Sequence, residues 1–468
     1  MPKDLRQFIK LAKEAGPEFY VEVNRPLKPE YEVCVLQQKL AKEGHFPLIY
    51  CREIEGSKLP LITDAFGSYK LLGLALDITP EGLKTMGRKG VLQEYRRRQA
   101  GLKPTKDVPA SQAPVQEVTL QGEDVDLGLL PIIHHYELNP AKYISIGMTI
   151  CKDPDTGRPN VGVYRHEVKG KDRLACMLYP LPGAHAVHIA KRYAELRKPM
   201  EVVTVIGHHP AVAMGATGKT PIEKNELEVI GALLDEPLEV TRGLTVDLPV
   251  PANAEIAIEG VIDPNKMDTE GPFSESLGYY GQGRPCYIIQ ITAITMRKDA
   301  IYQNLDPIHP EHGISLLYHE CNLYDRMKSI FPNVKAIHYA SEGHLGKNFM
   351  YISIKKRSPG EGRLAGLLAL STFPIGKIAV VVDEDIDVYN EQEVLWAIGN
   401  RVRGELDILT IPRMPTTSLN PSARDESGFN NGVMDTKILI DATEPEGFAT
   451  RVTPPKNLWE AMKLEDYL

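Results

Sequence analysis

Apolar and polar residues follow three different patterns along the chain, and each pattern covers its own section. In the first section, to about residue 115, apolar residues predict an amphipathic helix over residues 1–16, further helices over 30–43 and 80–101, and a short strand over 47–52. The arginines at 96–98 are interpreted as a solvated helix end, with an anion contact as the alternative. Residues 102–115 hold three prolines without periodicity, which predicts a linker.

A second section, residues 116–305, has the pattern of consecutive antiparallel strands. The turn sequence DPDTGRP joins strand-like runs at 143–152 and 160–168. Further β-type runs occupy residues 174–179, 201–207, 238–250, 255–262 and 286–296. Helical patterns over 185–198 and 225–236 interrupt them. Successive strands of this kind predict a meander or a barrel.

The third section, residues 306–445, alternates between the two periodicities. Helices are predicted over 315–330, 361–371 and 391–402, and strands over 350–355 and 377–382. This alternation is typical of an α/β domain. The tail, residues 446–468, ends in a helical pattern that is a candidate for docking on a neighbouring molecule. The fold class is therefore α/β, in the sense of an α+β multidomain chain.

Composition narrows the function classes. The chain has 468 residues and a net charge of −8, so no basic field exists to hold nucleic acid or an anionic membrane. Its six cysteines include no CxxC pair, which excludes a zinc ribbon and favours a reducing compartment. The start of the chain lacks a signal-peptide pattern, and Pro374 and Lys377 break its most apolar window. We therefore predict a soluble, cytoplasmic protein.

One motif suggests a nucleotide hydrolase. The stretch AMGATGKT, from Ala213, is one residue away from a P-loop, and AVVVDE at 379–384 resembles a strand whose acid holds Mg²⁺. However, Ala213 replaces the first glycine, and His208-His209-Pro210 separates the loop from the preceding strand. A P-loop-like NTPase remains as an alternative.

Two acidic residues and an arginine are candidates for acid–base chemistry. Glu270 and Glu275 flank the turn in EGPFSE, and neighbouring carboxylates repel, so that one of them tends to keep a proton. The alternative is an acidic surface turn. Arg165, in NVGVYR, is suited to orienting a carboxylate. Asn160 and Arg165 would point to opposite faces of a regular strand, unless that strand twists or bulges or the two residues serve different parts of one long ligand.

Two helix starts carry possible ligands. His185 opens a predicted helix, where free N–H groups favour phosphate, and His188 follows it in an HxxH spacing that is usually incidental. Glu226 lies in the first turn of the next helix, where a carboxylate at least suits the helix dipole. Taken singly, neither residue defines a site.

Taken together and in order, these motifs resemble those of the UbiD family of decarboxylases. They are NVGVYR, AH at 184–185, NELEVIG, VPANAEIAIEG and EGPFSE with GYY. The similarity covers most of residues 116–445. It implies an N-terminal α/β domain (1–115), a central split β-barrel domain that binds prenylated FMN (116–305), a C-terminal α/β oligomerisation and substrate-pocket domain (306–445) and a C-terminal tail helix (446–468). It also implies a homodimer or a larger homo-oligomer.

The resemblance further implies cofactors and site residues. The family uses prenylated FMN, supplied by a flavin prenyltransferase, with Mn²⁺ (or Mg²⁺) and K⁺ nearby. The metal ligands would be Asn160, His185 and Glu226, and an amide, an imidazole and a carboxylate together suit such a hard cation. Residues expected to bind the cofactor are Asn160, Val161, Gly162, Val163, Tyr164, Arg165, Ala184, His185 and Glu226.

The implied reaction is the reversible, non-oxidative decarboxylation of an aromatic, heteroaromatic or α,β-unsaturated acid. Arg165, Glu270 and Glu275 would be catalytic, with Glu275 as the proton donor to the carbon that loses CO₂. Ser274 stands where many members have glycine, which we expect to tune the pocket only. Candidates for the substrate pocket are Leu419, Asn420, Pro421 and the corner 309–312, for which a capped loop is the alternative. A subunit of a multi-component aryl carboxylase is the other alternative.

Overall fold

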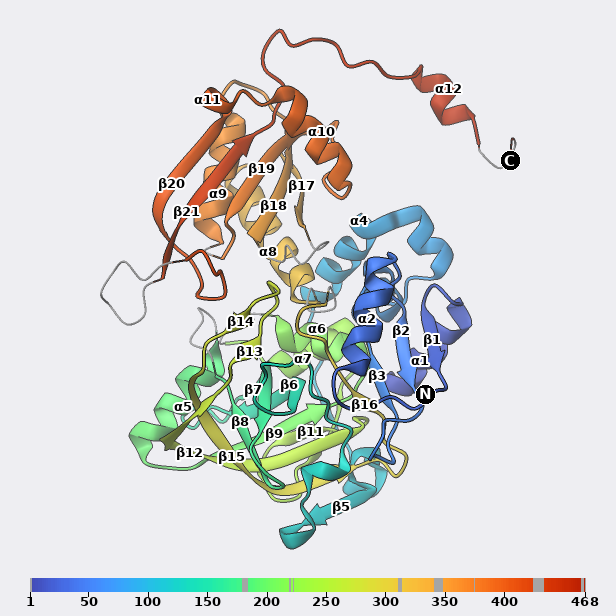
Figure 1. Cartoon of the computed structure of the whole chain (residues 1–468), viewed down its shortest axis with the longest axis vertical. Coiled ribbons are helices and arrows are strands. Elements are labelled where there is room, and N and C mark those ends of the chain that lie inside the picture. Colours follow the sequence, from blue (N-terminus) through green and yellow to red (C-terminus); the bar gives the residue numbers. More distant parts are fainter. Residues whose placement is uncertain are drawn as a thin grey trace.

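The structure is a computed structural model that describes residues 2–178, 184–218, 220–221, 223–309, 314–340, 348–373, 375–423, 433–463 and 467. Three sections follow one another along the chain, and the third stands above the other two in Figure 1. No helix in the described ranges is both long and apolar enough to cross a membrane.

The N-terminal section packs four helices around a small sheet. The helices are α1 (Leu5–Ala15), α2 (Glu32–Lys42), α3 (Tyr69–Ala75) and α4 (Pro80–Gln99). The sheet contains β1 (Tyr20–Val23), β2 (Leu48–Cys51), β3 (Leu61–Thr63) and β16 (Tyr302–Gln303). The last of these strands comes from beyond the barrel, so the N-terminal section is tied to the middle of the chain. Helix α1 buries Leu5, Phe8 and Ala12, as its amphipathic pattern predicts.

A closed antiparallel barrel forms the centre of the molecule. Its six strands, in spatial order, are β12 (Ile256–Glu270), β9 (Met200–Ile206), β6 (Tyr143–Lys152), β7 (Pro159–Val168), β8 (Arg173–Cys176) and β15 (Arg284–Met296). The ring closes because β12 pairs with both β9 and β15. Strand β5 (Val118–Gln121) extends β15 at the outside. Five of the predicted barrel strands are confirmed within three residues, whereas β12 continues to Glu270, eight residues beyond its predicted end at 262.

Shorter elements surround the barrel. They are α5 (His185–Leu196), α6 (Pro210–Thr217), α7 (Glu226–Leu234), the sheet of β4 (Lys106–Asp107), β10 (Glu239–Arg242) and β11 (Pro249–Pro251), and the hairpin of β13 (Phe273–Ser274) and β14 (Tyr280–Gly281). Short 3-10 turns lie at Ala110–Gln112, Pro114–Gln116, Gly122–Asp124 and Leu127–Leu129. Helix α6 was not predicted, because its uniformly apolar sequence is buried on every side and so shows no amphipathic period.

The C-terminal section is an α/β sandwich. Its sheet has the order β17 (Val334–Tyr339), β18 (Phe349–Ile354), β19 (Ile378–Asp383), β21 (Met434–Asp441) and β20 (Ile408–Pro415). One apolar cluster joins this sheet to α8 (Ile314–Ile330) and α9 (Glu361–Thr372), and a second joins its other face to α10 (Glu391–Arg401). The short helix α11 (Gly404–Asp407) precedes β20, and α12 (Lys456–Ala461) lies on an extended arm (Figure 1).

Two sequence predictions were wrong. Residues 238–250 form a pair of strands rather than one, because the Glu259 carboxylate accepts hydrogen bonds from the N–H groups of Leu244 and Thr245 and so fixes a turn between β10 and β11. Arg98 was predicted to lie at a solvated helix end, but it is buried. Its guanidinium is buried and donates to the carbonyl oxygens of Leu76 and Leu233, which lie at the ends of two other helices.

Candidate active site

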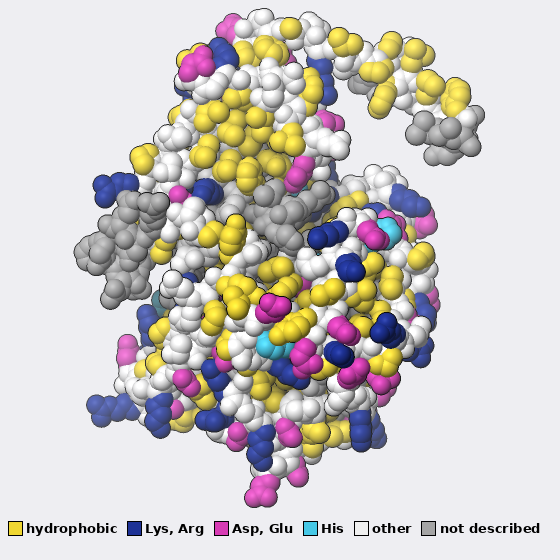
Figure 2. All heavy atoms as spheres, in the orientation of Figure 1, with side chains coloured by type: hydrophobic (Ala, Val, Ile, Leu, Met, Phe, Trp, Pro, Cys, Tyr) yellow, Lys and Arg dark blue, Asp and Glu magenta, His cyan; other side chains and the backbone are white. Residues whose placement is uncertain are grey.

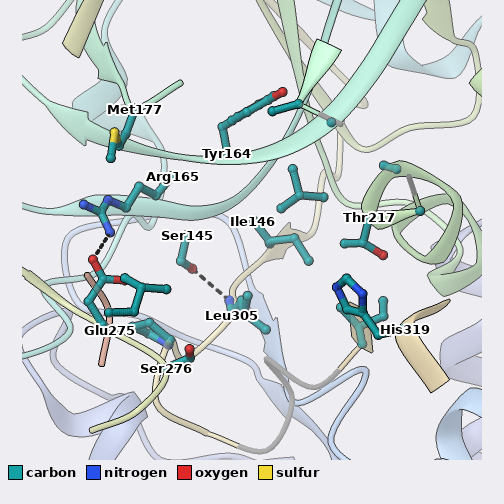
Figure 3. A pocket seen from close by; sticks show the side chains of 18 of the residues that line it. Ser145, Ile146, Tyr164, Arg165, Met177, Thr217, Glu275, Ser276, Leu305 and His319 are labelled. Carbon is teal, nitrogen blue, oxygen red and sulfur yellow. Dashed lines mark hydrogen bonds and ion pairs between the residues drawn. The ribbon is translucent and has the colours of Figure 1, made fainter. Parts of the chain in front are cut away.

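A cavity of about 350 Å³ lies where the barrel meets the C-terminal section. Strand β7 forms one wall, and the hairpin β13–β14, α8 and the loop around residue 417 form much of the rest. Figure 3 shows Arg165 and Glu275 on one side of this space and His319 and Thr217 on the other. The cavity also exposes apolar side chains, among them Phe273, Leu277, Leu305 and Ile314.

Arg165 holds both carboxylates of the EGPFSE motif. Its Nη2 and Nε donate to the two oxygens of Glu270 at 2.6 and 3.2 Å, and its Nη1 donates to Glu275 Oε1 at 2.6 Å. Glu270 is 1% exposed and Glu275 is 9% exposed. Burial alone would lower the pKa of Arg165, but the two carboxylates outweigh it and raise that pKa. The network therefore places two carboxyl groups and a permanent cation together in one largely buried site.

Local structure explains why these three side chains meet. Between Ile144 and Gly147 strand β6 shifts register against β7, and the extra residue lies in β6, opposite Arg165, rather than between Asn160 and Arg165. The hairpin β13–β14 then returns the chain so that Glu275 faces Arg165. Glycine at position 281 leaves room for the Glu275 carboxylate as it faces Arg165, because a Cβ atom there would lie 2.7 Å from Glu275 Oε1. The Phe273 ring also lies under the guanidinium, 4.4 Å from its carbon.

The other expected residues meet elsewhere on the same cavity. Glu226 Oε1 accepts a hydrogen bond from Asn160 Nδ2 at 2.9 Å and lies 3.2 Å from His185 Nδ1. Burial raises the pKa of Glu226, although the bonds from Asn160 and His185 oppose this shift. Helix α7 presents Glu226 in its first turn after the Asn225 cap, and α5 begins at His185. The side chains of Asn160 and His185 thus both contact one oxygen of Glu226, and three groups that can ligate a cation lie together.

Metal binding itself is not shown by this geometry. Within the part of the chain that the structure describes, no cluster of three or more His, Cys, Asp or Glu side chains could hold a metal ion. The trio of Asn160, His185 and Glu226 contains only two residues of those types. A divalent cation would therefore need the amide oxygen of Asn160 as its third ligand. The oxygen and nitrogen of an amide are told apart only by their hydrogen bonds, so the amide can turn its oxygen towards a cation.

The remaining predicted residues divide into those that line the cavity and those that do not. Val161, Gly162, Val163, Tyr164, Ala184 and Leu419 line it. Asn420 instead donates to Asp435, Pro421 is exposed, and His309 is buried against Asp64 at 3.2 Å. Residues 310–312 lie outside the described residues. His319, Thr217 and Thr417 line the cavity but were missed, because they come from distant elements without a shared motif.

The P-loop interpretation is not supported. Ala213–Thr217 form part of the buried helix α6, where a phosphate-binding loop would need exposed backbone N–H groups. Asp383, the supposed Mg²⁺ ligand, lies at the end of β19 in the sheet of the C-terminal section. The two motifs therefore belong to separate structural units.

The cavity thus combines the Arg165 ion pairs at one end with the polar group of Asn160, His185 and Glu226 at another. The UbiD family model, described as the 3-octaprenyl-4-hydroxybenzoate carboxy-lyase Rift-related domain, matches residues 106–310, and the model of the C-terminal domain matches residues 313–442. The chain therefore belongs to the UbiD family, and it is an enzyme of the carboxy-lyase class.

Individual relatives agree with this assignment. A phenolic acid decarboxylase of Sedimentibacter hydroxybenzoicus is 31% identical over 95% of this chain and 92% of that protein. The UbiD-class enzyme HmfF of Pelotomaculum thermopropionicum, solved in complex with FMN, is 30% identical and superposes with a TM-score of 0.89 over 99% of this chain and 100% of that chain. An evolved dimeric form of HmfF, in complex with prFMN, is 29% identical, with a TM-score of 0.85 over 99% and 100% of the two chains.

Proposed function

We propose that this chain catalyses the reversible, non-oxidative decarboxylation of an aromatic, heteroaromatic or α,β-unsaturated carboxylic acid with prenylated FMN. The observation that carries the proposal is one cavity that exposes Arg165 and Glu275 on one part of its wall, with Glu270 buried behind Arg165, and Asn160, His185 and Glu226 on another part. The binding of FMN and prFMN by the HmfF structures supports the choice of cofactor.

The residues present fit this cofactor. Strand β7 offers it a surface from Asn160 to Arg165, and position 162 must be small, because a Cβ atom there would lie 2.8 Å from the Tyr164 ring. Asn160, His185 and Glu226 would hold Mn²⁺ or Mg²⁺ and through it the cofactor phosphate, with K⁺ nearby as the family resemblance implies. When bound, prenylated FMN supplies the electron sink that loss of CO₂ from an sp² carbon requires.

The chain's own residues supply the acid–base steps. Arg165 would orient the substrate carboxylate, because its guanidinium reaches the cavity while Glu270 fixes it from behind. Glu275 would deliver a proton to the carbon that has lost CO₂. Phe273, Leu277 and Leu305 would exclude water and favour departure of neutral CO₂.

The test combines a spectrum and a reaction. The chain would be co-expressed with a flavin prenyltransferase, purified, and scanned for flavin absorbance, and CO₂ release would be measured over a panel of aryl, heteroaryl and acrylic acids. We expect a coloured protein and release from at least one acid. A colourless protein would contradict the proposal. So would a fully loaded protein that releases no CO₂ from any acid of the panel and also fails to carboxylate the corresponding products with ¹³CO₂.

Self-association completes the proposal, as a homodimer or a larger homo-oligomer. Figure 2 shows hydrophobic side chains gathered over the C-terminal sheet, where Phe349, Ile378 and Ile440 are only half-buried. The arm carries Leu458 and Trp459 with 53% and 73% of their surface exposed. These apolar surfaces suit a second copy. Light scattering should give at least twice the monomer mass, and Trp459→Ser should lower it, whereas Met86→Ser, an exposed apolar control on α4, should not.

A further inference from the structure

A third buried carboxylate, Glu167, lies directly behind the acid–base network. It is 3% exposed and accepts three contacts. Tyr143 Oη donates to Glu167 Oε2 at 3.0 Å, the N–H of Gly271 donates to the same oxygen at 2.9 Å, and Lys169 Nζ pairs with Oε1 at 2.5 Å. Donors thus surround Glu167, an arrangement that suits a carboxylate, which only accepts hydrogen bonds.

Tyr143 joins this carboxylate to the network. Its hydroxyl lies 3.0 Å from Glu167 and 3.4 Å from Glu270 Oε2. A phenol has one proton to donate, and the shorter contact takes it. Since Gly271 follows Glu270 directly, the Glu167 carboxylate contacts both the side chain that bridges to Glu270 and the backbone from which the Glu275 hairpin begins.

The charges in direct contact do not balance. Three carboxylates, Glu167, Glu270 and Glu275, form ion pairs with two cations, Arg165 and Lys169. Unbalanced charge in a buried site is costly, and a carboxyl group avoids the cost by keeping a proton. One retained proton makes the five-residue cluster neutral.

Other titratable groups lie around these five residues. Cys176 on β8 and Cys286 on β15 are neutral thiols, since burial raises both pKa values, that of Cys286 to about 12. Asp268 is exposed on β12, whereas Arg284 lies opposite Glu270 on β15 and is a further cation beside the cluster. Arg284 donates to Ser418 Oγ at 2.5 Å, on the C-terminal side of the cavity.

We propose that Glu167 is a positioning residue whose negative charge keeps one proton in the Glu270–Arg165–Glu275 network at neutral pH. The inference rests on the proposed function in one respect, namely that Glu275 donates the proton. In each turnover, that proton moves from the Glu275 oxygen to the carbon that has lost CO₂, and the network then takes one proton back from water. Without the charge of Glu167, the repulsion that favours the protonated form of the network is weaker, and the network loses its proton at a lower pH.

Two substitutions of opposite sign test the charge count. Glu167→Gln removes the excess negative charge, whereas Lys169→Gln increases it and keeps an amide that can donate to Glu167. Glu259→Gln is the matched control, because Glu259 is a fully buried carboxylate that accepts the N–H groups of a remote turn. Each variant would be compared with the parent by infrared spectroscopy of the full chain, in which a protonated carboxyl absorbs apart from a carboxylate. This readout needs neither cofactor nor substrate.

The expected result is specific to each variant. The parent and Glu259→Gln should show the same protonated-carboxyl band at pH 7, Glu167→Gln should lose the band of one carboxyl group, and Lys169→Gln should keep it to higher pH than the parent. An unchanged band in Glu167→Gln, or shifts of the same sign in both variants, would overturn the inference. If Glu167→Gln does not fold, Lys169→Gln alone decides the question by its direction.

Kinetics then separate this inference from the proposed function. With the best acid of the panel, the alkaline limb of kcat should move to lower pH by about one unit or more in Glu167→Gln and to higher pH in Lys169→Gln. A merely structural role would lower kcat evenly without moving the limb. If the parent releases CO₂ but neither limb moves, the inference fails and the function stands. If the infrared bands shift as expected in an inert protein, the charge count stands and the function fails.

Discussion

Replacement of Glu275 by glutamine tests the proton donor with the smallest change of shape. The amide keeps the length of the side chain, and its oxygen can still accept the hydrogen bond that Arg165 Nη1 now gives to Glu275 at 2.6 Å. Glu270 continues to hold the other edge of the guanidinium. Fold and cofactor content should therefore be retained, whereas an amide cannot protonate carbon.

The magnitude follows from the role. A positioned general acid contributes roughly a hundredfold to ten-thousandfold to the rate, so Glu275→Gln should lower kcat at least a hundredfold, or about 2.7 kcal/mol in activation free energy. Glu275→Asp keeps an acid with a shorter reach and should retain part of the rate. An acidic surface turn, the competing interpretation of the motif, predicts nearly unchanged rates in both variants.

The assay is steady-state CO₂ release at matched flavin content, with Glu259→Gln as the control for loss of a buried carboxylate elsewhere in the barrel. Circular dichroism and the flavin spectrum establish that fold and loading are equal. A Glu275→Gln enzyme whose kcat lies within tenfold of the parent would refute the assignment. A Glu275→Asp enzyme that is less active than Glu275→Gln would refute it as well. Activity would then depend on the length of the side chain and not on its proton.

Three further predictions concern the cofactor, the pH dependence of stability and a buried arginine. Glu226→Gln should lower flavin content after gel filtration more than it lowers turnover per bound flavin, because it removes the one carboxylate of the proposed cation site. Burial lowers the pKa of His135, His166 and His208 to about 4, 3 and 4. As the pH falls, the unfolded chain therefore binds protons before the folded chain does. The free energy of unfolding should keep its full value above pH ~6.5 and decrease below it, by up to about 1.4 kcal/mol per pH unit for each histidine. Equal urea midpoints at pH 7 and pH 5 would contradict this. Arg98→Ala should cost about 2–4 kcal/mol in urea unfolding, since it strips the donor from two buried carbonyl groups, whereas the exposed neighbour in Arg97→Ala should cost little.

The sequence predicted most of the barrel well because its strands are runs of β-type residues, several of them separated by strong turn signals. Strand β6 was placed at its observed limits, and β7 and β15 within two residues. Prediction failed where a distant side chain decides the local structure. The Glu259 carboxylate fixes the turn between β10 and β11. Carbonyl groups at the ends of α3 and α7 accept hydrogen bonds from Arg98 and hold it in the interior. Neither contact leaves a mark in the sequence near the affected residues.

The candidate site shows the same division. Asn160, Arg165, Glu270 and Glu275 could be found because they belong to short motifs whose residue types suit acid–base or cation chemistry. The C-terminal wall could not be found in this way. His319 comes from α8 and Thr417 from the loop after β20, and only the packing of the C-terminal sheet against the barrel brings them to the cavity. Of the proposed pocket residues in that loop, Leu419 lines the cavity, while Asn420 is engaged with Asp435.

Charge balance explains why the motif residues alone give an incomplete account of the site. Arg165 and two glutamates leave one negative charge in a buried place, and the NVGVYR motif ends before Glu167, which is two positions further along the same strand. The fold adds it, because residues two apart on a strand share a face. It also adds Lys169, two positions on again, and Tyr143 from the neighbouring strand. The acid–base site is therefore a property of one face of β7 and its neighbours, and a substitution at any charged position on that face changes the proton balance at Glu275.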